Sequence, residues 1–317
     1  MDKTIKSGSD LNDIQGVVVP LITPLYEDGR VNKKDLMNLI QFLMDAGIEN
    51  IFILGSSGEG VSLPYAEKVK VVETACGFID GRANVLVGIG GTCVQEAVDL
   101  LKVAERFNPQ AIVSTLPCYY HLQELEIANY YRSLADNTDI PLMAYNIPSF
   151  VQTNITAETA IMLFERGIIT GIKDSANRWE SIQKLLMYAA LHPDFKVYIG
   201  DEGLYLAGGL IGTAGFVSAG ANIMPEVVLA LYQACQAGRK KQALDAYAHL
   251  LRIRAIYNRK PSFIANIKGI AEIKELCHRW LSSPLHSLSD DEFGQLKNEY
   301  LQSEINDPRT TYMAILE

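Results

Sequence analysis

Residues 168–175 read Ile-Ile-Thr-Gly-Ile-Lys-Asp-Ser, a short apolar run that ends in a single basic side chain. The run over 168–173 predicts a buried β-strand with Lys173 at its end. Because an ammonium group is costly to keep charged in apolar surroundings, we expect a lowered pKa and a nucleophilic amine, as a Schiff base requires. The alternative is a lysine that leaves the sheet and enters solvent beside Asp174.

Seven further apolar runs alternate with amphipathic stretches along the chain. The eight runs lie at 16–22, 51–54, 85–89, 111–115, 141–145, 168–173, 195–200 and 215–218. Residues 33–46 predict a helix that Gly47 ends, with Leu36, Leu39, Ile40 and Leu43 at helical spacing. Repeated strand–helix units of this number predict an α/β fold, the (β/α)8 TIM barrel.

Polar stretches follow several of the predicted strands. They are Gly-Ser-Ser-Gly-Glu at 55–59, Pro-Cys-Tyr-Tyr-His at 117–121, Tyr-Asn-Ile-Pro at 145–148, Lys-Asp-Ser at 173–175 and Gly-Asp-Glu at 200–202. In a barrel of this kind the loops after the strands build the active site. We expect all of these groups to face one mouth of the barrel, which favours a functional Lys173 over a solvated one.

We expect three segments along the chain. Residues 1–14 form an N-terminal segment that is polar and lacks the apolar core of a signal peptide. Residues 15–224 form the barrel. Residues 225–317 form a helical C-terminal extension and a tail, with the extension packed on the barrel.

The amino-acid composition limits the kinds of binding partner that this protein is expected to have. The chain has 317 residues, of which 48% are hydrophobic, and a formal charge of -9, which opposes binding to nucleic acid phosphates. No apolar stretch is long enough to cross a bilayer, so no membrane partner is expected. The five cysteines are widely spaced and never form a CxxC pair, which is typical of free thiols in a reducing compartment. The prediction is a cytoplasmic protein.

The sequence predicts no cofactor and no metal. Gly88, Gly90 and Gly91 make a glycine-rich strand end, but neither a dinucleotide-binding nor a P-loop pattern follows. The histidines are dispersed and form no i, i+4 pair that could hold a metal.

The ordered set of motifs resembles a known family. Gly-Ser-Ser-Gly-Glu, Tyr-Asn-Ile-Pro, Gly-Ile-Lys-Asp-Ser, Gly-Asp-Glu, the Gly-Phe-Val-Ser stretch from 215 and Asn222 are similar to the dihydrodipicolinate synthase and N-acetylneuraminate lyase family over roughly 15–300. The resemblance implies a class I, metal-independent aldolase on a (β/α)8 barrel. It also implies a homo-oligomer, a dimer of dimers, acting on small-molecule 2-oxo acid and aldehyde substrates.

By the same resemblance, Lys173 forms an imine with C2 of pyruvate or another 2-oxo acid, and Tyr145 relays protons beside it. Ser56 and Ser57 bind the substrate carboxylate, and Ser57 is also a catalytic candidate. Packing alone remains the alternative for Tyr145, and helix capping for the serines.

Tyr119 matches a tyrosine that crosses a subunit interface and completes a hydroxyl relay in the neighbouring active site, although interface packing alone is the alternative. Ser175 and Val217 are further substrate-binding candidates by resemblance. Glu59 matches the glutamate of the family motif, and its position indicates that it holds the turn rather than taking part in chemistry.

The aldehyde side of the site departs from the synthases. Phe150 stands where their carboxylate-binding arginine is expected, which removes a bidentate anion site. Asp201 and Glu202 resemble the acidic pair with which sialic acid lyases hold sugar hydroxyls, although both could instead cap the following helix. The sequence therefore predicts a Schiff-base lyase or aldolase for a 2-oxo-3-deoxy sugar acid. A synthase or a sugar-acid dehydratase is the alternative enzyme, and a 2-oxo-acid-binding regulatory protein is the alternative outside catalysis.

Overall fold

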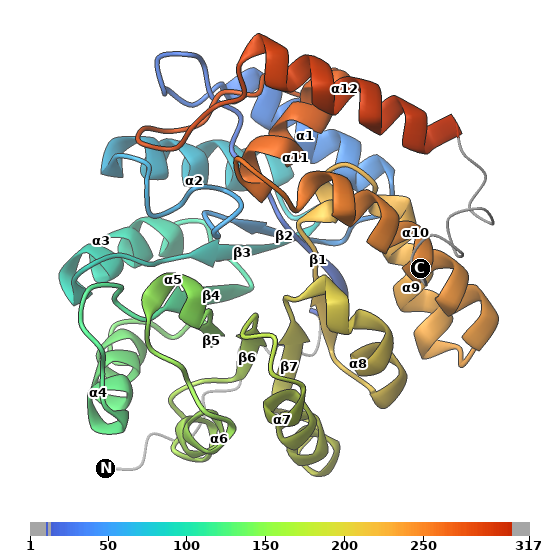
Figure 1. Cartoon of the computed structure of the whole chain (residues 1–317). Coiled ribbons are helices and arrows are strands. Elements are labelled where there is room, and N and C mark those ends of the chain that lie inside the picture. The colour runs from blue at the N-terminus through green and yellow to red at the C-terminus, as the bar shows by residue number, and fades with distance from the viewer. Residues whose placement is uncertain (1–10, 12–13, 306–317) are drawn as a thin grey trace.

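Eight parallel strands close into a barrel in the computed structural model (Figure 1), which describes residues 11 and 14–305. The expected segment 1–14 and the end of the expected tail therefore lie almost wholly outside the described residues. The strands are β1 Gly16–Pro20, β2 Asn50–Ile53, β3 Asn84–Gly88, β4 Ala111–Thr115, β5 Leu142–Asn146, β6 Gly171–Asp174, β7 Lys196–Ile199 and β8 Gly215–Val217. Each strand pairs with its neighbours in sequence, and β8 pairs with β1, which confirms the predicted TIM barrel.

Helices surround the barrel in the order that the sequence predicts. They are α1 Lys33–Asp45, α2 Tyr65–Ile79, α3 Val94–Glu105, α4 Glu124–Ala135, α5 Pro148–Val151, α6 Ala157–Glu165, α7 Trp179–Leu191, α8 Tyr205–Ile211, α9 Pro225–Gln236, α10 Lys240–Tyr257, α11 Phe263–Ile273 and α12 Asp290–Ile305, with the short 3-10 turns η2 Glu202–Leu204 and η3 Gly220–Asn222. In α1 the Asn32 side chain accepts a hydrogen bond from the amide of Asp35, and the four predicted apolar residues are buried.

The helix α9 follows β8 and packs against β1 and α8, so it closes the outer ring of the barrel. The expected boundary at residue 225 thus falls before the last helix of the ring. The helices beyond it, α10, α11 and α12, pack against one another, and α10 packs against α8 and α9 (Figure 1). In the described part of the chain, these three helices follow the outer ring.

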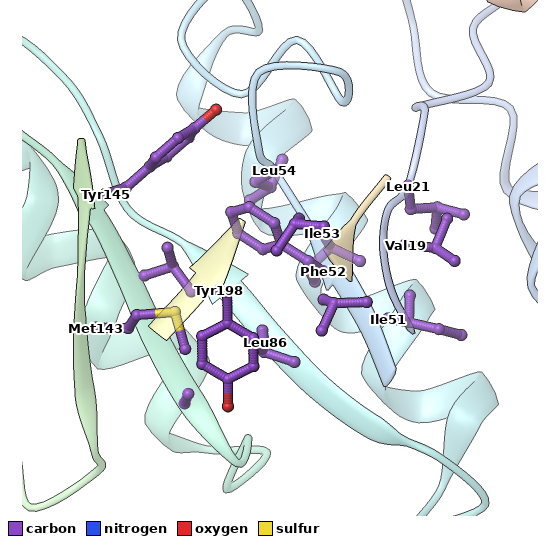
Figure 2. Packing of buried hydrophobic residues seen from close by; sticks show 14 of the residues in the cluster. Val19, Leu21, Ile51, Phe52, Ile53, Leu54, Leu86, Met143, Tyr145 and Tyr198 are labelled. Atoms are coloured by element: carbon purple, nitrogen blue, oxygen red, sulfur yellow. The ribbon is translucent and has the colours of Figure 1, made fainter. Parts of the chain in front are cut away.

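Side chains from several strands fill the barrel interior, among them Phe52, Leu86, Met143 and Tyr198 (Figure 2). They alternate with residues that face the helices, as the two-residue period of a strand requires. The packed interior holds the strand ends in fixed positions, and the site lies there.

The predicted strands differ from the observed ones by one or two residues at most ends and by three at the start of β6. Ile168 and Ile169 are buried but precede the strand, because the strand pairing of β6 with β5 begins at Gly171. An apolar run in the sequence predicts which residues are buried, but it does not predict the residue at which strand pairing begins. The register of β5 and β6 pairs Tyr145 with Lys173, which brings these two residues side by side.

Candidate active site

Lys173 lies inside the barrel, with 4% of its surface exposed. Its Nζ is 3.7 Å from the centre of the Tyr145 ring and 5.0 Å from that of Phe52. Burial lowers the pKa of the amine from its ordinary value of 10.5, although Tyr145 acts in the opposite direction. Burial therefore makes proton loss from Lys173 easier, and the free amine is the nucleophilic form.

Asp174, the neighbour of Lys173 in sequence, is held away from it. Its Oδ2 accepts a hydrogen bond from the Asn146 side chain at 2.8 Å, and its Oδ1 accepts one from the amide of Ala176 at 2.9 Å. Burial raises the pKa of this carboxyl. Because the two side chains alternate across the strand, Lys173 has an aromatic environment in place of a carboxylate partner.

Tyr145 connects Lys173 to the turn that follows β2. Its hydroxyl is 3.4 Å from Oγ of Ser56. Burial raises the pKa of the phenol, but the charge of Lys173 and the hydroxyl groups of Ser56 and Ser175 outweigh it, so that the pKa lies below its ordinary value of 10.0. A phenol of lowered pKa that touches both an amine and a hydroxyl can pass a proton between them.

The turn Gly55-Ser-Ser-Gly-Glu brings backbone amides and two hydroxyl groups to this point. A Cβ on Gly58 would lie 2.6 Å from the carbonyl oxygen of Leu21, so only glycine allows the turn to pack this closely on the end of β1. Ser57 is buried and Ser56 is partly exposed. The turn is thus fixed by packing, and amides in such a turn are donors for an anion.

A cavity of about 30 Å³ opens beside Ser56 and Tyr145, and Gly90 and Thr115 also line it. A larger cavity of about 690 Å³ lies between α2 and α3. Neither Lys173, Tyr145 nor Ser56 lines the larger one. Ser56 and Tyr145 line the smaller cavity, and Lys173 lies against the Tyr145 ring without lining the cavity itself.

Ser175 lies next to the reactive lysine. A Cβ added to Gly200, at the end of β7, would be 2.1 Å from Oγ of Ser175 and 3.2 Å from Cε of Lys173. The absence of a side chain at Gly200 therefore leaves room for both groups. A hydroxyl at this position can hydrogen-bond a substrate oxygen close to the amine.

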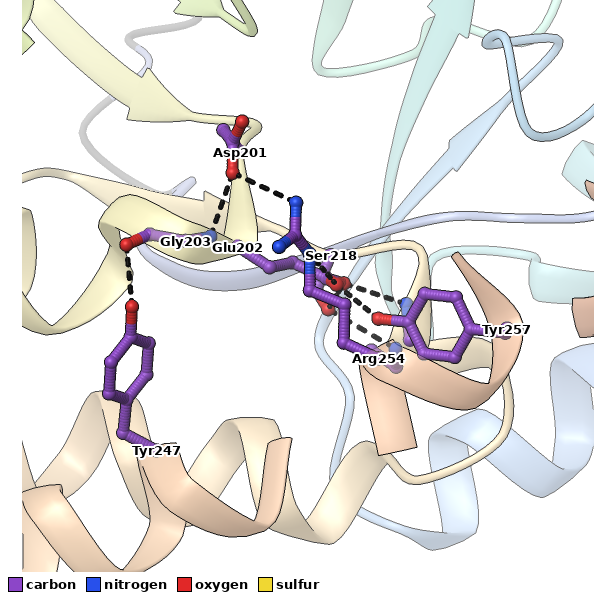
Figure 3. A network of polar contacts seen from close by, with 9 residues as sticks. Asp201, Glu202, Gly203, Ser218, Tyr247, Arg254 and Tyr257 are labelled. Carbon is purple, nitrogen blue, oxygen red and sulfur yellow. Dashed lines mark hydrogen bonds and ion pairs between the residues drawn. The ribbon is translucent and has the colours of Figure 1, made fainter. Parts of the chain in front are cut away.

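The two acidic residues after β7 have different surroundings (Figure 3). Glu202 is buried: its Oε1 accepts hydrogen bonds from Ser218 Oγ at 2.7 Å and from the amide of Gly220 at 2.9 Å, and its Oε2 accepts one from Tyr257. Asp201 caps η2 through Oδ1, which accepts from the amide of Gly203 at 2.7 Å.

Arg254, on α10, lies between the two carboxylates of this network. It is 3.3 Å from Oδ1 of Asp201 and 3.7 Å from Oε2 of Glu202. Both carboxylate oxygens of Glu202 are thus hydrogen-bonded within the protein, which fits a structural role for this residue. The Oδ2 atom of Asp201 takes part in none of these contacts, so Asp201 retains an oxygen that can accept a hydrogen bond.

Two other predicted residues, Tyr119 and Val217, have different surroundings. Tyr119 is 76% exposed and its ring packs against that of Tyr120 with 5.0 Å between centres. Val217 is buried in β8, opposite Val18 of β1. The structure brings Lys173, Tyr145, Ser56 and Ser175 together, and the roles expected for Tyr119 and Val217 stay predictions.

Sequence reasoning missed Thr115 and Arg254. Thr115 pairs with Tyr145 across β4 and β5 and lines the small cavity. Its place at the end of a strand was a signal that could have found it. Arg254 lies in the interior of a C-terminal helix, and no local pattern relates it to β7.

Within the described residues, no group of three or more His, Cys, Asp or Glu side chains is arranged to hold a metal ion. The five cysteines carry free thiols. The helices of the described region include none that is both long and apolar enough to span a membrane.

Relatives of known name match nearly the whole chain. The model of the Dihydrodipicolinate synthetase family matches residues 13–302. The chain is 28% identical over 260 residues to the probable 2-dehydro-3-deoxy-D-pentonate aldolase YjhH of Escherichia coli, covering 81% of this chain and 86% of that protein. It is 30% identical over 288 residues to the putative 2-dehydro-3-deoxy-D-gluconate aldolase YagE of the same organism, covering 89% and 94%.

Solved structures share the fold over a similar span. The crystal structure of YagE from E. coli in complex with pyruvate matches with a TM-score of 0.87 and 27% identity, over 92% of this chain and 99% of that one. Dihydrodipicolinate synthase from Bacteroides thetaiotaomicron matches with a TM-score of 0.87 and 27% identity, over 91% and 98%. The similarity therefore includes both the barrel and the helices that follow it.

Proposed function

The chain belongs to the Dihydrodipicolinate synthetase family, and on that premise we propose that it is a pyruvate-dependent class I aldolase for 2-oxo-3-deoxy sugar acids. The observation that carries this proposal is the buried Lys173 against the Tyr145 ring, 3.7 Å away, at the mouth of the barrel. Similarity to proteins named as 2-dehydro-3-deoxy sugar-acid aldolases supports the substrate class.

The proposed reaction begins when Nζ of Lys173 attacks C2 of the substrate, and loss of water gives a protonated imine. The imine draws the electrons of the C3–C4 bond as that bond breaks, while Tyr145 accepts the proton of the C4 hydroxyl. An aldehyde leaves and an enamine remains on Lys173. Protonation of C3 and addition of water then release pyruvate and regenerate the amine.

Ser56 and Ser57 would bind the substrate carboxylate through backbone amides of the turn after β2, and Ser56 Oγ would keep the Tyr145 hydroxyl in place. Ser57 remains a catalytic candidate, and Val217 remains a candidate for lining the 2-oxo acid. Ser175 would contact the substrate close to the new C–N bond. The buried turn and the contact at Gly200 support these positions.

For the aldehyde half, we propose that Asp201 accepts a hydrogen bond from a substrate hydroxyl through Oδ2. We propose that Glu202 acts on the same half indirectly, by holding η2, because Ser218, Gly220 and Tyr257 engage its oxygens. Phe150, which is 52% exposed, supplies no charge for a second carboxylate.

The substrate class is tested by the ratio of kcat/KM for a polyhydroxylated aldehyde and for aspartate semialdehyde, each with pyruvate. An aldehyde without hydroxyl groups would leave the polar groups of such a site without hydrogen-bond partners, so the polyhydroxylated aldehyde should be preferred. Asp201→Ala should lower that preference, while Asp245→Ala, an exposed change on α10, should not. Higher efficiency with aspartate semialdehyde would instead indicate a synthase. With a 2-oxo-3-deoxy sugar acid as the substrate, loss of water without release of pyruvate would indicate a dehydratase.

We further propose a cytoplasmic homotetramer in which Tyr119 completes the site of a neighbouring subunit. The exposure of Tyr119 and of Tyr120, 76% and 72%, supports an interface at this mouth. Light scattering of the purified protein tests the assembly. A monomer with full activity would remove Tyr119 from the mechanism.

A further inference from the structure

A buried ion pair joins the C-terminal extension to the active-site turn. Nζ of Lys268, in α11, lies 2.5 Å from Oε1 of Glu59, and both side chains have no exposed surface. Oε2 of Glu59 accepts hydrogen bonds from the amide and the hydroxyl of Ser282, at 2.6 and 2.7 Å. Lys268 also donates to the carbonyl oxygen of Trp280 at 2.6 Å. Residues more than two hundred positions apart therefore form one connected group.

Glu59 is part of the turn that carries Ser56. The amide of Glu59 donates to the carbonyl oxygen of Ser56 at 3.1 Å. Glu59 has a left-handed backbone, with φ of 57°, which a residue with a side chain adopts only when its surroundings impose it. A displacement of the Glu59 side chain is therefore transmitted directly to Ser56.

The contact between Ser56 and Tyr145 is sensitive to such a displacement. Their hydroxyl oxygens are 3.4 Å apart, beyond the ordinary range for hydrogen bonds between hydroxyl groups. A further shift of a few tenths of an ångström would separate them. The position of the turn thus decides whether Ser56 can act with Tyr145.

We propose that Lys268 is a positioning residue that acts through Glu59 to hold Ser56 against Tyr145, so that the C-terminal extension is part of the catalytic apparatus. This inference rests on the proposed function. Stability alone does not explain this ion pair, because well-packed apolar residues often stabilise a buried position as much as two desolvated charges do. An ion pair, unlike apolar packing, fixes where the Glu59 carboxylate lies.

The test is a double-mutant cycle with Lys268→Met and Ser56→Ala, measured well below the unfolding temperature of every variant. Lys268→Met should lower kcat by about tenfold, a part of the usual contribution of proton transfer. In the Ser56→Ala background it should have little further effect, since residues that act through one another are not additive. Arg259→Met removes the partner of Glu299 in the same extension, at an ion pair that includes neither Glu59 nor Ser282, and should leave kcat unchanged.

A second variant covers the case in which Lys268→Met does not fold. Ser282→Ala deletes one hydrogen bond to Glu59 and keeps the Ser282 amide, and it should also lower kcat without adding to Ser56→Ala. Losses of kcat that add fully to that of Ser56→Ala, or an unchanged kcat in both variants, would overturn the positioning role. Reductive trapping of pyruvate on Lys173 of the wild type is measured alongside, and its failure would overturn the proposed function itself.

Discussion

Tyr145→Phe removes one oxygen atom from the centre of the proposed mechanism. The hydroxyl contacts Ser56 at 3.4 Å, whereas the ring that lies 3.7 Å from Nζ of Lys173 remains. We therefore expect proton transfer to fail while imine formation persists. General acid–base groups contribute a factor of about 100 or more to turnover, and each tenfold corresponds to about 1.36 kcal/mol of activation free energy, so the loss is about 2.7 kcal/mol or more.

The assay measures pyruvate release under saturating sugar acid, together with borohydride trapping of pyruvate on the same variant. We expect kcat to fall by about 100-fold or more and trapping to continue. The free energy of unfolding should change by only about 1 kcal/mol, the net contribution of one hydrogen bond. Turnover equal to that of the wild type, or loss of trapping together with turnover, would refute the separation of roles between Tyr145 and Lys173.

Three further predictions follow from the same contacts. Because only the free amine of Lys173 attacks, the rate of imine formation should rise with pH through a midpoint below 10.5. Tyr145→Phe should move that midpoint lower, since Tyr145 raises the pKa of Lys173. An unchanged midpoint in kinetic titrations of the variant would contradict the coupling between the two residues. The folded state binds the Lys173 proton less tightly than the unfolded chain, so the charged lysine destabilises the fold below its lowered pKa, and this penalty disappears as the pH rises toward 10.5. Lys173→Met should therefore raise Tm at neutral pH. A lower Tm of this variant in calorimetry would contradict the prediction. Gly60→Ala places a Cβ 2.0 Å from the carbonyl oxygen of Leu54 and should lower both stability and kcat. Gly77→Ala, in the interior of α2 with open space around it, should instead stabilise the protein by about 0.5–1 kcal/mol. Denaturant titration of the two variants checks this, and equal changes in stability would contradict it.

The barrel could be predicted because its signal is repeated. Each of the eight apolar runs contains or overlaps a strand, and the helix over 33–46 differs from α1 by one residue. Strand limits were less accurate, as at Ile168 and Ile169, because hydrogen-bond pairing depends on the neighbouring strand as well as on local composition. The helix α9 was assigned to the extension because its sequence is as helical as the part that follows.

The core of the site could also be predicted, because its groups stand at strand ends and the barrel brings such ends together. The order of the strands implies that β5 and β6 are neighbours, and the register between them pairs Tyr145 with Lys173. The partners of Glu202 could not be predicted in this way. Tyr257 and Arg254 reach it from a C-terminal helix whose packing on the mouth is decided by tertiary contacts.

The same limit applies to the buried pair of Lys268 and Glu59. The sequence indicates that Glu59 holds a turn, and it contains no signal for the partner. A lysine inside a helix normally extends into solvent, and only the fold shows that this one is enclosed. Long-range polar contacts of this kind are where the structure adds most to the sequence.

The proposed mechanism requires an imine between Lys173 and pyruvate, and reductive trapping detects that bond. Protein incubated with pyruvate and borohydride is digested, and the modified lysine is identified by mass spectrometry. Lys268, a second buried lysine that is ion-paired, serves as an internal control. We expect one pyruvyl adduct per chain, on Lys173, and none in Lys173→Met. An unmodified protein, or an adduct on another lysine that persists in Lys173→Met, would contradict it.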